Sequence, residues 1–534
     1  MYKLVNRQNL IYLYSIGMIG LCVGMPWSNV IMSVGSIWVL CVWLIEMLSR
    51  NFRSKKGEDI SWPKRSKWVF WGLFSLTLLH VFGLIHTSDY DYAFNDLRKK
   101  LPLLLFPVVC YSMLSLPSAM WLWLKRFFVA SLFVAVLACF IINWAWWEQA
   151  HFDVRQLSVF TSHIRFSLML NLGLVILFKE ALQRSFPKIL ALVFGLVYIL
   201  FMWEVQSITG LGLLGVLVMY AAWTSLKAKG LKATRGALIV LSLLGLISSA
   251  VFIGSAIYEH YYSGSSEFQG GKTSEGNDFE CELNKRYRES GALVYCNFNR
   301  YEMSLAWNER SEVLFTGKTK TGGLISATLM RYMTAIGVTK DYQGVLSLSD
   351  EDIAAVEQGI TNPKLLERSA LHQRVDQLFF EIDALNSGDD PSGKSFIQRI
   401  EYWKTATHII QKHPFIGVGT GDVQTAFNQQ YEEDQSALSE RFRLRSHQQF
   451  LTFWVAFGVF GPLLLLLAIY LCYRYRKAEN SFIALGFLLI VSLSFLSEDT
   501  LETQAGVTFF SFFISFLFLW PIASPSASEK PHQE

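Results

Sequence analysis

Residues 237–257 read ALIVLSLLGLISSAVFIGSAI, a stretch without a charged side chain. A helix that crosses a bilayer needs roughly 20 largely apolar residues, because in hydrocarbon every backbone polar group must be satisfied within the helix itself. This stretch therefore predicts a membrane span. The same criterion predicts twelve spans, near residues 10–27, 29–48, 68–86, 101–116, 127–145, 166–180, 189–205, 208–224, 237–257, 449–472, 481–497 and 506–521.

The composition agrees with a polytopic membrane protein. Hydrophobic residues make up 52% of the chain and charged residues only 17%, so the charges must be clustered between apolar runs. The formal net charge of +4 is small and reflects the inside loops, which gives no support to nucleic-acid binding. We therefore expect an all-α polytopic protein surrounded by membrane lipids, with no nucleic-acid partner.

The basic residues of the short loops predict the orientation of the spans, because Lys and Arg concentrate on the cytoplasmic side. Arg50 and Arg53 place the loop after span two inside the cell. Alternation then puts both termini in the cytoplasm and the long segment after span nine outside. The cations at residues 98–100, Arg155 and Arg165 fall on the outer side, against the rule, and are therefore candidates for a function.

The spans divide the chain into four segments. Residues 1–257 are expected to form a membrane domain with spans one to nine, and residues 258–446 a large, mainly helical extracytoplasmic loop. Residues 447–521 would form a second membrane segment with spans ten to twelve, followed by a cytoplasmic tail at 522–534.

The large loop carries two cysteines and three predicted helices. Cys281 and Cys296 could form a disulfide if the loop faces an oxidising compartment. Leu324–Ile336 and Asp350–Gln358 are predicted to form short helices, and apolar residues recur at helical spacing from residue 396 to just before Pro414, which predicts a third helix there.

His447 is the first candidate for chemistry. Ser446 and Gln449 fit a capping box that would open span ten, so His447 is expected in the first turn of a membrane helix at the outer surface. There the helix dipole and neighbouring arginines disfavour imidazolium, and a neutral imidazole can accept a proton from a hydroxyl. The alternative is an interfacial histidine that only tolerates the headgroup region, and position alone favours that alternative.

Arginines near the end of the loop are candidates for binding an anion. Arg399 begins an amphipathic helix, where a cation is unfavourable unless an anion also binds there, and it shares a helix face with Trp403. A guanidinium binds phosphate through two parallel hydrogen bonds, so Arg399 with Arg441, Arg443 or Arg445 could clamp a diphosphate. For any single one of the last three, a salt bridge to nearby acidic residues is the preferred alternative.

Further charged residues lie at the outer ends of predicted spans. Arg165 begins span six, where a cation is costly enough to indicate an anionic partner, although it could instead extend to lipid phosphates. Glu498, Asp499 and Glu502, between spans eleven and twelve, lie at the same depth and could pair with the arginines or order them.

Other motifs give no support to a metal or a cofactor. The histidines and cysteines lack zinc-type spacing. The sequence GVGTGD at residues 417–422 lacks the Lys-Ser/Thr ending of a phosphate-binding loop, and is interpreted as a turn supporting the helix of Arg399. Asp422 would cap a following helix that extends to Tyr431.

Three stretches resemble the O-antigen ligase and polymerase family of bacterial envelope glycosyltransferases. They are QRIEYW at 398–403 leading into HPFIGVGTG at 413–421, SHQQFL at 446–451 followed by Gly458 and Gly461, and SEDTLETQAG at 497–506. The family commonly has Asn where this chain has Gln448, and a further arginine near the start of span eight, where this chain reads QSITG at 206–210. Arg165 could replace that cation.

The resemblance implies a GT-C-like enzyme of the inner membrane, with the large loop in the periplasm and without a metal. It would transfer a glycan from undecaprenyl diphosphate to a sugar hydroxyl of lipid A-core or another glycan acceptor. His447 would deprotonate the acceptor and Arg399 would hold the diphosphate. Arg165 and Arg445 would assist in donor binding, and supporting roles fall to Trp403, Gln448, Glu498 and Glu502.

Three alternatives remain open. A polymerase of the same family joins repeat units instead of ligating a finished glycan. The family motifs do not separate the two activities, and a ligase is the preferred interpretation. A secondary transporter would explain twelve spans equally well, and it predicts paired ionisable residues at mid-membrane and discontinuous helices. A receptor or structural protein is the residual alternative.

Overall fold

The chain divides into two compact units of helices. The computed structural model describes residues 6–54, 66–144, 154–263, 270–365, 370–392, 395–476 and 481–520, so the predicted tail at 522–534 lies outside the described residues. The first unit comprises Met1–Ala228, Tyr402–Glu432 and Leu444–Glu534, and the second comprises Lys229–Glu401 and Glu433–Arg443. Helices dominate both units and the described strands are two or three residues long, which confirms the expected all-α class.

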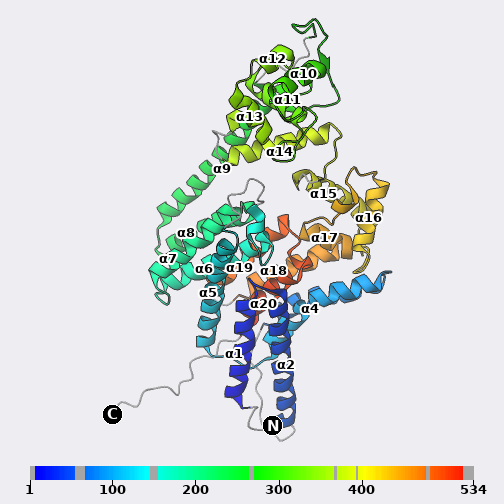
Figure 1. The fold of residues 1–534 in the computed structure, drawn as a ribbon. Helices are drawn as coiled ribbons and strands as arrows, with labels where there is room; N and C mark the ends of the chain where they lie inside the picture. The colour runs from blue at the N-terminus through cyan, green and yellow to red at the C-terminus, as the bar shows by residue number, and fades with distance from the viewer. Residues whose placement is uncertain are drawn as a thin grey trace. The chain divides into compact units, whose positions relative to one another are not determined.

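The first unit contains most of the apolar helices (Figure 1). Its N-terminal elements are α1 (Arg7–Gly24), α2 (Asn29–Ser54), α3 (Lys67–Phe82), α4 (Tyr90–Ser112), α5 (Ser118–Ile142), the short 3-10 helix η2 (Val154–Leu157), α6 (His163–Leu182), α7 (Lys188–Glu204) and α8 (Ile208–Ala228). Its C-terminal elements are the later part of α15 (Ser395–Lys412), α16 (Val423–Glu433) except its last residue, α17 (Gln449–Phe457), α18 (Phe460–Arg474), α19 (Ser481–Ser497), η5 (Thr500–Glu502) and α20 (Gln504–Leu519).

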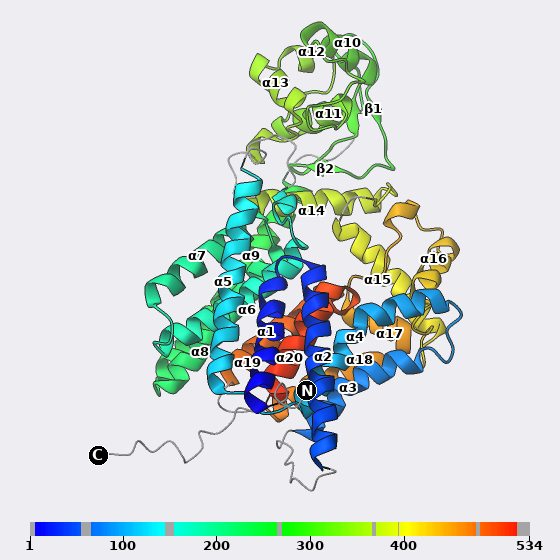
Figure 2. The ribbon, with the colours of Figure 1, turned by 60° about the horizontal axis from the view of Figure 1, so that its bottom comes forward.

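Helix α20 forms the centre of the first unit. Its side chains are buried from Ala505 to Leu519, and it packs against α2, α3, α4, α6 and α19. The two ribbon views show α20 enclosed among these helices (Figure 2). A helix that is apolar on every side is stable only where protein or lipid surrounds it. Here aromatic contacts such as Phe106 with Phe512 and Phe128 with Phe513 hold it in place.

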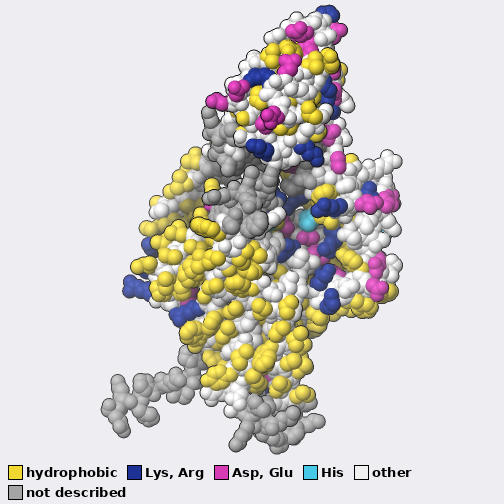
Figure 3. Space-filling model, in the orientation of Figure 1, with side chains coloured by type: hydrophobic (Ala, Val, Ile, Leu, Met, Phe, Trp, Pro, Cys, Tyr) yellow, Lys and Arg dark blue, Asp and Glu magenta, His cyan; other side chains and the backbone are white. Residues whose placement is uncertain are grey.

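Several helices have the length and composition of membrane spans. Four described segments are long and apolar enough to cross a bilayer, namely Asn29–Arg50, Ser118–Ile142, Ile208–Ala228 and Lys232–Tyr262. Shorter apolar helices lie at Lys67–Phe82, Phe460–Arg474, Ser481–Ser497 and Gln504–Leu519. On the face drawn in Figure 3, apolar side chains cover α1, α2, α7 and α8. Ile16 of α1, Val34 of α2 and Leu196 of α7 are exposed. These observations support a membrane protein, and the number of twelve crossings stays a prediction.

The predicted span ten is not one helix. The chain breaks between α17 and α18 at Gly458, whose φ is 61°. Gly458 lies against the backbone of Phe415, and a Cβ added to Gly458 would be 2.0 Å from the Phe415 carbonyl group. The amides of Val418 and Gly419 donate to the carbonyls of Val455 and Ala456, each at 2.9 Å. The loop after α15 thus satisfies carbonyls that a helix end otherwise leaves unpaired, which explains the break.

The basic cluster at residues 98–100 is also placed differently from the expectation. The predicted span begins at residue 101, whereas helix α4 begins at Tyr90 and continues through Pro102 and Pro107. The cluster therefore belongs to a helix and not to an outer loop. Arg98 and Lys99 are exposed, but Lys100 is buried.

The second unit consists of a long apolar helix and a small globular region. Its elements are α9 (Lys232–Tyr262), β1 (Glu280–Cys281), β2 (Arg288–Glu289), β3 (Ala292–Leu293), β4 (Cys296–Phe298), α10 (Arg300–Arg310), α11 (Ile325–Ile336), α12 (Tyr342–Leu346), α13 (Asp350–Gln358), η3 (Pro363–Leu365), α14 (Ala370–Asn386), the start of α15, and η4 (Glu440–Phe442). Strands β1 and β4 pair antiparallel, as do β2 and β3. The predicted helices at α11, α13 and α15 are confirmed.

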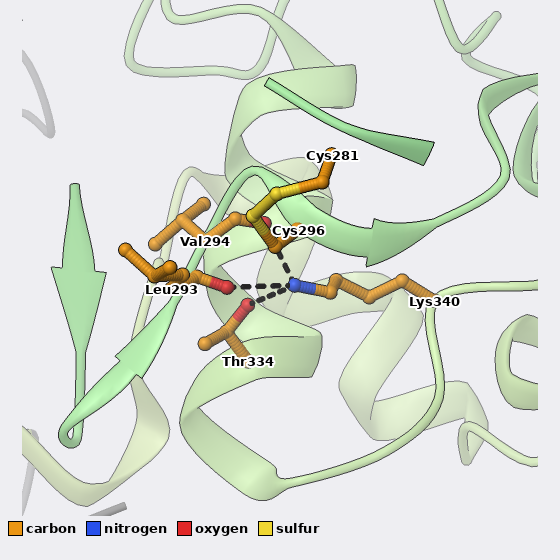
Figure 4. Close-up of a disulfide and its surroundings, with 6 residues drawn as sticks. All are labelled: Cys281, Leu293, Val294, Cys296, Thr334 and Lys340. Atoms are coloured by element: carbon orange, nitrogen blue, oxygen red, sulfur yellow. Dashed lines mark hydrogen bonds between the residues drawn. A yellow bond between two sulfur atoms is a disulfide. The ribbon is translucent and has the colours of Figure 1, made fainter. Parts of the chain in front are cut away.

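A disulfide links strands β1 and β4, and a buried lysine links the backbone at the end of β3 to helix α11. Cys281 and Cys296 are disulfide-bonded, and closing a loop of about 15 residues stabilises a fold by roughly 3 kcal/mol. Beside them, Lys340 Nζ donates to the carbonyls of Leu293 and Val294 and to Thr334 Oγ1, at 3.0, 2.7 and 3.2 Å (Figure 4). Trp307 and Phe298 are fully buried in the adjoining core.

Candidate active site

His447 lies beside a carboxylate from a distant part of the chain. Its Nδ1 atom is 3.7 Å from Oδ1 of Asp499, which follows α19 and precedes η5. The imidazole side chain is 35% exposed and the carboxylate is 7% exposed. The pair therefore combines an accessible ring with a buried acid. Sequence reasoning grouped Asp499 with its acidic neighbours and did not assign it to His447.

The predicted capping box around His447 is wrong. Helix α17 begins at Gln449, and its N-cap is Gln448, whose side chain accepts a hydrogen bond from Leu451 N at 2.6 Å. His447 has a φ of 49°, which is a left-handed conformation that an α-helix does not contain. The helix therefore begins after His447. Ser446 is buried instead, with Oγ 2.7 Å from Thr452 Oγ1.

Two aromatic residues of α15 hold the segment that carries His447. Trp403 Nε1 donates to the carbonyl of Ser446 at 3.0 Å, directly before the histidine. The Tyr402 ring is buried and its centroid lies 5.6 Å from that of His447. Trp403 thus contacts the backbone of the segment, and Tyr402, which sequence reasoning did not single out, contacts the imidazole.

Arg165 faces the same carboxylate from the first turn of α6. Its Nη2 lies 3.9 Å from Asp499 Oδ1, the oxygen that also faces His447. The Arg165 side chain is 16% exposed, and its buried Nε has no hydrogen-bond partner among the described residues. A buried guanidinium donor without an acceptor is costly, so an anionic ligand here would supply a partner that the described chain does not.

Arg445 belongs to a buried ionic network centred on Glu502. Arg445 Nη1 donates to Glu502 Oε2 at 2.8 Å, and Lys100 Nζ donates to the same oxygen at 3.0 Å. Gln449 Nε2 donates to the other oxygen at 3.2 Å. Burial alone would raise the pKa of Glu502, but the charges of Lys100 and Arg445 outweigh it and lower the pKa to about 2. Glu502 is therefore an anion at neutral pH and orders Arg445.

The GVGTGD turn joins α15 and α17 to the connection between α3 and α4. Gly421 lies so close to Asp89 that an added Cβ would be 2.0 Å from its carbonyl oxygen. The Asp422 carboxylate accepts from Ser88 N and Oγ, at 2.7 and 2.9 Å, and from Asp89 N at 2.9 Å. The predicted helix after Asp422 begins at Val423, while the carboxylate itself binds the start of α4.

One group of side chains has the composition of a metal site. His447, Glu498 and Asp499 each offer a donor atom, and these atoms lie within 4.8 Å of one another. Sequence reasoning missed this group because two of its members are adjacent and the third lies far away in the sequence. The Asp499 oxygen that faces His447 also faces Arg165, so a guanidinium already provides positive charge there.

A comparison with known families identifies the segment that contains most of these residues. Residues 365–466 match the O-antigen ligase family. This match confirms the predicted resemblance. It supports an enzyme of the glycosyltransferase type that acts in O-antigen ligation or polymerisation, in a bacterial membrane. No curated protein matches the chain.

The O-antigen ligase match covers some of the predicted site residues and not others. It includes Arg399, Trp403, Arg445, His447 and Gln448. Arg399 lies on the part of α15 that belongs to the second unit and is half-buried. The remaining site residues, Arg165, Glu498, Asp499 and Glu502, lie outside the matched segment but in the first unit.

Proposed function

We propose that this protein transfers a glycan from an undecaprenyl diphosphate carrier to a sugar hydroxyl, and that the preferred reaction is ligation of O-antigen or a related polysaccharide to lipid A-core. The observation that carries the proposal is the arrangement of His447, Asp499 and Arg165, which combines a base, an acid that orients it and a cation. The O-antigen ligase match at residues 365–466 supports the class of donor and acceptor.

His447 acts as the general base in this proposal. Its Nδ1 faces Asp499, so the Nδ1 proton would be directed toward the carboxylate and Nε2 would be free to accept a proton. The acceptor hydroxyl loses its proton to Nε2 as its oxygen attacks the anomeric carbon of the donor. Asp499 then stabilises the imidazolium that forms, as a carboxylate does in hydrolase triads.

The leaving diphosphate requires positive charge. As the new glycosidic bond forms, the bond from the anomeric carbon to the diphosphate oxygen breaks, and the electron pair stays on the diphosphate. Arg165 supplies a guanidinium with an unpartnered Nε, and Arg445 supplies one that is ordered by Glu502. Attack from the side opposite the leaving group inverts the anomeric centre. Arg399 is proposed as a further phosphate ligand, on the resemblance alone.

We place the reaction at the periplasmic face of the inner membrane and propose that it needs no metal. The basic loops support this orientation, with both termini in the cytoplasm. The cationic neighbourhood of Asp499 supports a metal-free site, because a divalent ion at His447, Glu498 and Asp499 would lie next to Arg165. Like charges at such short range repel each other strongly.

A transfer assay with the purified full chain tests the proposal. Undecaprenyl diphosphate-linked glycan and lipid A-core are the substrates, and His447→Ala is expected to abolish transfer. The matched control is His86→Ala, since His86 is exposed on the connection between α3 and α4. Transfer that survives in His447→Ala, or is absent from the wild type with every glycan acceptor, would contradict the proposal.

Ligation and polymerisation by the same family differ in what accumulates. A His447→Ala strain that accumulates long lipid-linked glycan has lost a ligase. A strain that carries a single repeat unit on its final acceptor has lost a polymerase.

The broken helix at Gly458 is an observation that favours a secondary transporter, because discontinuous helices form many transport sites. However, the backbone of Phe415 and the following loop pack into the break. This packing accounts for the broken helix without a transport site. Substrate uptake into vesicles that contain the purified protein, without any glycan transfer, would favour the transporter.

A further inference from the structure

Helix α4 has charged residues on its buried face and large apolar residues on its exposed face. Asp96 and Lys100 are 5% and 6% exposed, whereas Phe94 and Leu101 are 60% and 55% exposed. The two charges are one helical turn apart, and Lys100 Nζ lies 2.7 Å from Asp96 Oδ2. A buried lysine is unfavourable unless it is paired, and Asp96 supplies one partner of Lys100.

Lys100 also reaches a residue that orders a proposed donor ligand. Its Nζ and Arg445 Nη1 donate to the same oxygen of Glu502, at 3.0 and 2.8 Å. The other oxygen of Glu502 accepts from Gln449. In the part of the chain that the structure describes, the Arg445 guanidinium makes this single hydrogen bond, and its side chain is 19% exposed.

We propose that Lys100 is a positioning residue for donor binding, which acts through Glu502 by limiting Arg445 to one hydrogen bond and leaving its other N–H groups for the diphosphate. This inference rests on the proposed function, in which Arg445 binds the donor.

The physical reason is competition for a carboxylate. Arginine and a carboxylate prefer two parallel hydrogen bonds, and that geometry would commit two nitrogen atoms of Arg445 to Glu502. Lys100 Nζ bonds Oε2 and Gln449 Nε2 bonds Oε1. Together they hold the carboxylate in an orientation that offers Arg445 only Oε2. Asp96 balances the lysine charge, so two cations and two anions lie together. A cavity of about 10 Å³ between Lys100 and Arg445 is too small for a diphosphate, so Lys100 acts through its neighbours and not by direct contact.

A double-mutant cycle tests whether Lys100 acts through Arg445. Initial rates are measured for the wild type, Lys100→Met, Arg445→Ala and the double variant, with kcat and the donor KM determined separately. Lys100→Met is expected to raise the donor KM about tenfold, and to have no further effect in the Arg445→Ala background, because coupled residues are not additive. Lys99→Met is the matched control, since Lys99 is the exposed neighbour on the same helix, and its KM should equal that of the wild type.

Each outcome decides the question. If the two single effects on KM multiply in the double variant, or if Lys100→Met lowers kcat alone, the inference is wrong. Unfolding temperatures show which variants are folded, and Lys100→Gln replaces Lys100→Met in the cycle if the latter unfolds.

If the wild type transfers no glycan, the proposed function fails by itself. The same cycle is then measured as equilibrium binding of radiolabelled undecaprenyl diphosphate, where additivity again overturns the role of Lys100.

Discussion

The Nδ1 atom of His447 lies 3.7 Å from Oδ1 of Asp499. His447 immediately precedes the N-cap of α17, and Asp499 lies in the connection between α19 and α20. Asp499 is buried and the imidazole is partly exposed. The carboxylate can therefore orient the ring through Nδ1 while the exposed part of the ring is accessible to an acceptor.

Replacing Asp499 by Asn should impair the chemical step. We expect Asp499→Asn to lower kcat by about 100-fold or more, because an amide neither stabilises imidazolium nor selects the tautomer that leaves Nε2 free. The donor and acceptor KM should change much less. Steady-state kinetics check this result, with Asp91→Asn as control, since Asp91 is exposed on α4. An unchanged kcat would show that Asp499 has no role in the chemical step.

Arg165 should contribute to donor binding through its geometry as well as its charge. We expect Arg165→Lys to raise the donor KM about tenfold and Arg165→Ala to raise it further, because lysine keeps the charge but lacks the planar fork that binds phosphate. The acceptor KM should stay constant. Arg98→Ala, at an exposed position of α4, is the matched control. Equal activity of Arg165→Lys and the wild type would show that charge alone matters.

Metal removal should leave the enzyme active. Dialysis against EDTA is expected to leave the transfer rate unchanged, because Arg165 already faces the Asp499 oxygen of the candidate ligand group. Elemental analysis of the purified protein provides the second measurement. A stoichiometric divalent metal that is lost in Glu498→Gln, together with loss of transfer, would instead establish a metal site.

The stability of the second unit should depend on pH through Lys340. Burial lowers the pKa of Lys340 to about 7, whereas in an unfolded chain it is about 10.4. Below about pH 7 the lysine is charged in both states and the cost of burial is constant. Between about pH 7 and about pH 10.4 the unfolded chain binds more protons than the folded chain, so the free energy of unfolding rises with pH, by at most roughly 1.4 kcal/mol per unit.

Hydrogen exchange of the α11 amides in the full chain measures this dependence, after correction for the intrinsic exchange rate at each pH. Lys340→Met should abolish the rise, whereas Lys318→Met should retain it, because Lys318 is exposed. A pH dependence that is identical in Lys340→Met and the wild type would assign it to other groups.

Local patterns predicted the helices well where periodicity and stop signals agree. The helices Ile325–Ile336 and Asp350–Gln358 lie where short helices were predicted, and the helix that begins at Ser395 ends before Pro414. These features depend on near neighbours in the chain. Two local predictions failed. The backbone of Phe415 packs against Gly458, where span ten breaks. The left-handed backbone of His447 shifts the start of α17.

The candidate site shows the same division. The misplaced cations near residue 100 and at Arg165 were recognisable from the sequence, because charge is unusual at the outer end of a span. Their partners were not recognisable. Lys100 and Glu502 lie 402 positions apart in the sequence, and Arg165 and Asp499 are also far apart.

By itself, the sequence determined the helical class, the apolar segments, the resemblance to O-antigen ligases and most of the residues with unusual charge. Only the tertiary structure decided that Asp499 faces both His447 and Arg165, and that one oxygen of Glu502 is shared by Lys100 and Arg445. The reason is physical. Helix formation and hydrophobicity are properties of short segments, whereas an ion pair depends on a separation of a few ångströms that packing alone establishes.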